Sequence, residues 1–62
     1  MIGDDIAVLS KKRVECREME REARLRADSA TTAEVRLTWT AIADEWQFLA
    51  DSVGELIALI AP

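Results

Sequence analysis

Apolar residues recur at alternating steps of four and three through the second half of the chain. The series covers residues 35–60, and all eight of its positions are apolar. A heptad pattern of this kind predicts a helix whose apolar stripe must be covered by another helix. The eight positions are Val35, Trp39, Ile42, Trp46, Leu49, Val53, Leu56 and Ile60.

The first half of the chain has a thinner apolar stripe and many charged helix-forming residues. Residues 5–28 contain no Gly or Pro, which predicts a helix over about this range. Asp4 and Asp5 suit its beginning because carboxylates favour the positive end of the helix dipole. Arg13 and Glu20 fall on or beside the stripe, which consists of Ile2, Ile6, Leu9, Cys16, Met19, Ala23 and Ala27.

A polar segment at residues 28–32 separates the two stripes. Its Asp, Ser and Thr side chains compete for backbone hydrogen bonds, so the helix is expected to break there. Thr31 and Glu34 have the spacing of a capping box, which predicts a second helix over about residues 32–60. A short connection makes the helices antiparallel neighbours. The prediction is an all-α fold in which residues 1–62 form one helical-hairpin domain; one continuous helix is the alternative.

Folding the hairpin at residue 30 pairs large residues with small ones. Trp39 then faces Ala23 and Trp46 faces Cys16, as close packing requires. The same register brings Arg17 toward Asp44 or Glu45. The predicted core between the helices consists of Ile6, Leu9, Cys16, Ala23, Val35, Trp39, Ile42, Trp46, Leu49, Val53, Leu56 and Ile60.

More apolar residues remain than one hairpin can cover. Ala43, Ala50 and Ile57 widen the stripe on one flank, and others lie on the far side of the second helix. Because an exposed apolar patch usually marks an association surface, a homodimer that forms a four-helix bundle is expected. A monomer with scattered surface hydrophobes is the alternative. The candidate dimer or partner surface consists of Val14, Leu25, Leu37, Ala41, Phe48, Ile57 and Leu59.

Composition and charge narrow the possible partners. The chain has 62 residues, and at this size a lone core gives about 3–5 kcal/mol of stability. The net charge is −4, and residues 29–62 carry five acidic groups and one basic group. This balance predicts no nucleic-acid partner and no binding to anionic membranes. The single Cys and the acidic N-terminal residues predict a cytoplasmic protein.

No catalytic, cofactor or metal site is predicted. The chain has no His, which removes the commonest general base and the usual nitrogen ligand of metals. Cys16 lies on the apolar stripe, so packing is the favoured interpretation. Arg13 and Glu20 are expected to set register. An acidic ridge on the second helix is expected to point outward into solvent: Asp44, Gln47, Asp51 and Glu55.

Residues 15–50 resemble a group of short bacterial proteins that are common in rhizobia and their relatives. These read approximately as ECRxLA, a polar turn and LAxxWxxLA. The chain departs from the pattern at Met19 and Glu20 and within residues 38–41. The resemblance implies a helical hairpin of unassigned function. It rests on Glu15-Cys16-Arg17, Ala23, Arg36, Ala43-Asp44-Glu45-Trp46 and Leu49-Ala50.

The function predicted from these patterns is a non-enzymatic protein–protein interaction or oligomerisation module. It would act by burying apolar helix faces against a second copy or another helical protein. One alternative is a bundle that binds a small ligand or a metal at the dimer interface, around Glu20, Arg13 and Cys16. Another is a small regulatory adaptor, antitoxin-like or phage-encoded, whose partner the sequence does not name.

Overall fold

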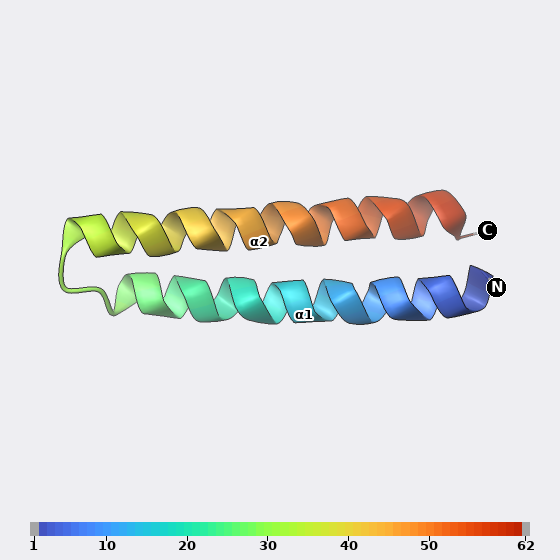
Figure 1. Cartoon of the computed structure of the whole chain (residues 1–62), viewed down its shortest axis with the longest axis horizontal. Coiled ribbons are helices and arrows are strands. Elements are labelled where there is room, and N and C mark those ends of the chain that lie inside the picture. Colours follow the sequence, from blue (N-terminus) through green and yellow to red (C-terminus); the bar gives the residue numbers. More distant parts are fainter. Residues whose placement is uncertain (1, 62) are drawn as a thin grey trace.

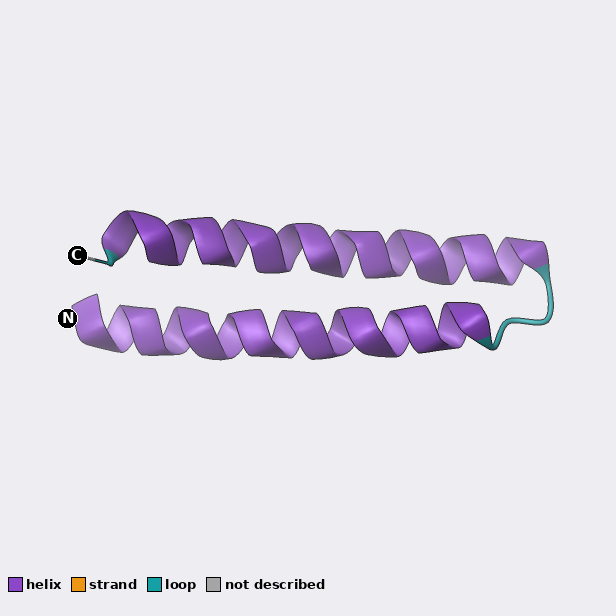
Figure 2. Ribbon diagram, turned by 180° about the vertical axis from the view of Figure 1, so that it is seen from behind, coloured by secondary structure: helices purple, strands orange, loops and turns teal. Residues whose placement is uncertain are grey.

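Two long helices lie side by side in antiparallel directions. The computed structural model describes residues 2–61, in which α1 (Ile2–Asp28) is joined by a short loop to α2 (Ala33–Ile60). The helices run beside each other over their whole length, and the start of α1 and the end of α2 lie at the same end of the molecule (Figure 1; seen from behind in Figure 2). The predicted all-α hairpin is confirmed.

The helix boundaries differ slightly from the predicted ones. The first helix begins at Ile2, before the predicted start near Asp5, so both Asp4 and Asp5 lie in its first turn. Carboxylates in that turn still interact favourably with the free backbone N–H groups. At the other end of α1 the backbone N–H of Ala30 donates to the carbonyl of Ala27, which tightens the last turn before the loop.

Thr32, not Thr31, caps the start of α2. The backbone at Thr32 is extended, and its hydroxyl accepts a hydrogen bond of 3.2 Å from the N–H of Val35. Because the helix begins at Ala33, Val35 is its third residue, which is the position that an N-cap side chain reaches. The prediction that Thr31 forms a capping box with Glu34 is therefore wrong, and the cap lies one residue later.

Small side chains form the contact between the helices. Ala43 and Ala50 of α2 are completely buried, with 0% exposure. No side chain larger than Val is buried in the described part of the chain. Small residues let two helix backbones approach closely while keeping the packing dense. The buried residues are Cys16, Ala23, Ala27, Ala43, Ala50 and Val53.

The predicted seam of α2 is corrected by a rotation of the helix. Its line of closest approach runs through Ala43 and Ala50, which the sequence prediction had placed on a flank. Close contact with the small residues of α1 favours this rotation because two indole rings do not fit between tightly packed helices. Of the predicted core residues, Cys16, Ala23 and Val53 are buried, Ile6, Leu9, Trp39, Ile42 and Trp46 are half-buried, and Val35, Leu49, Leu56 and Ile60 are 36–49% exposed.

Candidate functional site

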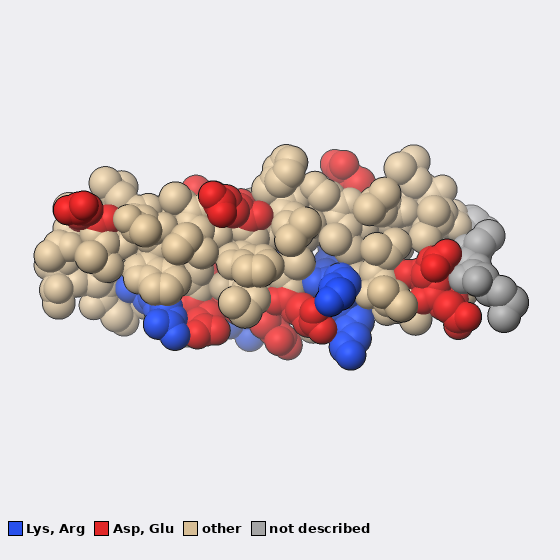
Figure 3. Space-filling model, viewed as in Figure 1, with Lys and Arg blue, Asp and Glu red and all other residues tan. Residues whose placement is uncertain are grey.

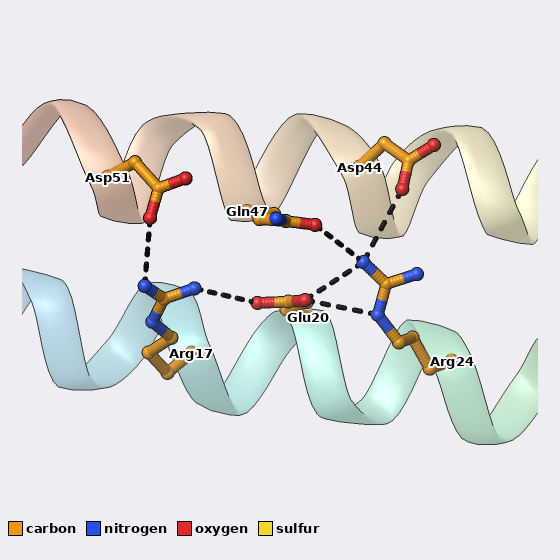
Figure 4. A network of polar contacts seen from close by, with 6 residues as sticks. All are labelled: Arg17, Glu20, Arg24, Asp44, Gln47 and Asp51. Carbon is orange, nitrogen blue, oxygen red and sulfur yellow. Dashed lines mark hydrogen bonds and ion pairs between the residues drawn. The ribbon is translucent and has the colours of Figure 1, made fainter.

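One face of the hairpin carries a network of charged side chains centred on Glu20. Arg17 Nη1 donates a hydrogen bond of 3.1 Å to Glu20 Oε1, and Arg24 Nε donates one of 3.0 Å to Glu20 Oε2. Arg17 Nη2 also donates to Asp51 Oδ1 of α2 at 2.8 Å. Arg24 Nη2 reaches Gln47 Oε1 at 2.9 Å (Figure 4). The network therefore joins the two helices along the middle of the molecule.

Glu20 is the acidic centre of this network. Its side chain is only 16% exposed and lies between two guanidinium groups. Hydrogen bonding from Arg24, and then from Arg17, lowers the pKa of Glu20 below its ordinary value of 4.5 and favours the charged form. The same hydrogen bonds to Glu20 raise the pKa of Arg17 and of Arg24. All three groups are thus held in their charged states.

The pairing across the helices differs from the predicted one by a heptad. Arg17 pairs with Asp51 rather than Asp44, and Asp44 instead lies 3.4 Å from Arg24 Nη2. Side chains on a helix lean toward its N-terminus, so the tip of a long side chain lies level with earlier backbone residues of its own helix. In an antiparallel pair, two such side chains therefore meet when the sum of their residue numbers is larger than the sum for two backbone positions that lie opposite each other. The predicted ridge is exposed as expected, but Asp44, Gln47 and Asp51 also bond to side chains of α1.

We call this side of the molecule the charged face, formed by Arg17, Glu20, Arg24, Asp44, Gln47 and Asp51. In Figure 4 α2 lies above α1, as in Figure 1, but α1 runs from left to right instead of from right to left. The charged face is therefore the one seen from behind in Figure 2. Figure 3, viewed as Figure 1, shows the opposite face, on which uncharged side chains cover most of the middle and a basic group interrupts them right of centre.

Two open grooves lie between the helices away from the charged face. The groove nearer the turn has a volume of about 280 Å³, and its apolar lining includes Ala23, Trp39 and Ile42. The other groove has a volume of about 470 Å³, and its lining includes Cys16 and Leu49. Met19 and Trp46 line both grooves. We call the side with these seven residues the groove face: Cys16, Met19, Ala23, Trp39, Ile42, Trp46 and Leu49.

Charged side chains of α1 border the groove face. Arg26 lies over the ring of Trp39, with its guanidinium carbon 5.0 Å from the ring centroid, a cation–π distance. Arg26 also pairs with Glu22 at 2.8 Å, and Lys12 pairs with Glu15 at 3.4 Å. These i, i+4 and i, i+3 pairs lie along the edge of the groove face, and Trp39 and Trp46 remain partly exposed beside them.

The predicted dimer surface is divided between the two helices. Val14 and Leu25 are exposed on α1, and Leu37, Ala41, Phe48 and Leu59 are exposed on α2. Ile57 is half-buried, because it lies one heptad beyond Ala50 and continues the line that faces α1.

The polar residues of the predicted alternative site do not come together within one hairpin. Glu20 belongs to the charged face and pairs with Arg17 and Arg24, whereas Cys16 lines a groove on the other side. Arg13 lies against Gly54, where a Cβ would stand 3.5 Å from Arg13 Nε. Among residues 2–61 no three of the Cys, Asp and Glu side chains are grouped so as to hold a metal ion.

The two grooves and the hydrogen bond of Gln47 to Arg24 were not predicted from the sequence. The sequence does hold a signal for the grooves: Trp39 and Trp46 form one series at seven-residue spacing on α2, and Ala43 and Ala50 form another. Either series could face α1, and the size of the α1 side chains decides which one does.

Comparison of the chain with protein-family models, with curated proteins and with solved structures gave no match. The resemblance to short rhizobial proteins therefore stays a prediction. Neither helix, as far as the structure describes it, contains an apolar stretch long enough to cross a membrane.

Proposed function

We propose that this chain is a non-enzymatic protein–protein interaction module that dimerises through its groove face. The observation that carries the proposal is that the small side chains are buried between the helices while the large apolar ones are partly exposed. Small residues fill the contact between the helices, while Trp39, Trp46 and Leu49 remain partly or largely accessible. A hairpin of this size gains little stability from a core of small residues, so burial of the larger ones against a partner would add to it.

The dimensions of the groove face suit a second copy of the hairpin. The Cα positions span 47 by 14 Å in the plane of Figure 1, a rectangle of about 660 Å² before side chains are added. Stable interfaces bury roughly 800 Å² on each partner. A face of this area, matched in length by an identical face, would form a four-helix bundle with Trp39 and Trp46 as anchors.

The charged face is the less suitable interface. Its guanidinium and carboxylate groups already satisfy one another, and burying them further would remove their remaining hydration. In the proposed bundle it therefore points into solvent. The mutual pairing of Glu20, Arg17 and Arg24 also favours a role in fixing register over a role in catalysis.

Two adjacent residues of α2 provide a matched test of the interface. Leu49 lines a groove and is 44% exposed, whereas Phe48 is 74% exposed and lies about 100° further around the helix. We expect Leu49→Glu to lower the mass measured by light scattering to that of one chain, because a carboxylate would be buried in the apolar interface. Phe48→Glu should leave the dimer intact. Equal behaviour of the two variants would place the interface elsewhere.

A further inference from the structure

The outer side of α2 carries the three most exposed large apolar side chains of the described residues. They are Leu37, Phe48 and Leu59, which are 70%, 74% and 80% exposed. Successive members are eleven residues apart, and eleven residues make three helical turns with little angular drift. They therefore form a row nearly parallel to the helix axis, about 33 Å long at 1.5 Å per residue. We call it the outer row.

A carboxylate stands beside each member of the outer row. Glu34 and Glu45 precede Leu37 and Phe48 by three residues, and Glu55 precedes Leu59 by four. These spacings place each carboxylate next to its apolar residue on the helix surface. All three Glu side chains are exposed, and the ion pairs among residues 2–61 include none of them. Figure 3 shows acidic groups without basic ones along this edge of α2.

The hydroxyl groups near the outer row are already bonded within the helix. Thr38 Oγ1 donates to the carbonyl of Glu34 at 3.0 Å, and Ser52 Oγ donates to the carbonyl of Phe48 at 2.9 Å. The strong polar groups left on this side are therefore carboxylates, which only accept hydrogen bonds when charged. A partner must supply donors, and positive charge would suit all three positions.

We propose that the outer row binds a basic amphipathic helix of another protein. The apolar side of that helix would cover Leu37, Phe48 and Leu59, and its Lys or Arg side chains would pair with the neighbouring glutamates. An acidic surface repels nucleic acid and anionic lipid head groups, so neither suits this site. A second copy fits less well because Arg36 is the one basic residue of α2 and α1 mixes both signs.

This inference does not depend on the homodimer. The outer row shares no residue with the groove face, so each surface can be occupied while the other is free. A chain that sediments as a monomer and still binds the basic helix would contradict the dimer and support the outer row.

The test uses two labelled synthetic helices of about 24 residues, a length that covers the row at 1.5 Å per residue. Both carry Leu at eleven-residue spacing; one has Lys one turn from each Leu, and the other has Glu at those positions. Fluorescence anisotropy with the full chain should show binding of the Lys peptide alone, weakening as salt is added. Phe48→Ser should weaken it about tenfold, as expected for an anchor. Glu45→Lys should weaken it and reduce its salt dependence, whereas Leu25→Ser, at an exposed position of α1 outside both surfaces, should leave it unchanged.

Three results would overturn the proposal. Equal binding of the Lys and Glu peptides would exclude recognition by charge. Binding of neither peptide by the folded chain would exclude the site itself. Conversion of a dimer into a monomer by Phe48→Ser would show that the row is an interface between copies of this chain.

Discussion

Ala43 and Ala50 determine how the two helices approach each other. Both are completely buried, and they lie opposite a helix whose own buried residues are Cys16, Ala23 and Ala27. Small side chains on both sides bring the backbones close and leave no room for an indole between them. The position of Trp39 and Trp46 at the edge of the contact is thus a consequence of the alanines.

Enlarging Ala50 should therefore separate the helices. We expect Ala50→Leu to lower the free energy of unfolding by about 1–3 kcal/mol, because overpacking forces the surrounding side chains and backbone to move. Ala41→Leu is the matched control, since Ala41 is exposed on the same helix. Urea unfolding followed by circular dichroism measures both. Equal stability of the two variants would show that Ala50 does not lie at the contact.

Glu20 should make stability depend on pH. Hydrogen bonds from Arg24 and Arg17 lower its pKa in the folded chain, so its contribution is complete above the ordinary pKa of 4.5 and is lost as the pH falls through the lower, folded value. We expect Glu20→Gln to be less stable than the natural chain at neutral pH and the difference to shrink in acid. Thermal melts at a series of pH values test this. A difference that does not change with pH would contradict it.

At the scale of the helices, the heptad period of the sequence predicted the helices themselves but not which side of α2 faces α1. The heptad of α2 and the polar residues near Ser29 were enough to predict two helices and the turn between them. They did not decide which stripe faces α1, because Ala43, Ala50 and Ile57 repeat with the same period as Trp39, Trp46 and Val53. That choice depends on side-chain volumes on the opposite helix.

Ion pairs within α1 were largely predictable from the sequence, whereas the partners of the ion pairs between the helices were not. The i, i+4 spacing within α1 predicts the pairs Glu20–Arg24, Glu22–Arg26 and Lys11–Glu15. The first two form, whereas Glu15 pairs with Lys12 instead. The pair between Arg17 and Asp51 was not expected because the predicted register ignored the lean of side chains toward the N-terminus of each helix. Local spacing thus predicts contacts within a helix better than contacts across two helices.

The start of α2 offers a direct comparison of the two possible caps. Only Thr32 accepts a hydrogen bond from Val35 N–H, so Thr32→Ala should lower the free energy of unfolding by about 1 kcal/mol. Thr31→Ala should change it little, since Thr31 is exposed and precedes the cap. Denaturant melts of both variants give the answer. A larger loss at Thr31 would restore the capping box expected from the sequence.

For the molecule as a whole, the two broad faces differ in what they offer a partner. One carries a network in which Arg17, Glu20 and Arg24 bond to one another and to α2. The other leaves Trp46 and Leu49 at open grooves between the helices. The contact between the helices is thus bordered by polar bonds on one side and by apolar grooves on the other, and this asymmetry underlies the proposed self-association.

Sedimentation equilibrium of the natural chain over a wide range of concentration tests that claim most directly. One chain has a mass of 6.9 kDa, so the proposed four-helix bundle has twice that mass, or 13.8 kDa. We expect the larger mass over most of the range and a return toward 6.9 kDa on dilution, accompanied by loss of helicity because folding and association are linked. A mass of 6.9 kDa at every concentration, with the helices fully formed, would contradict the account.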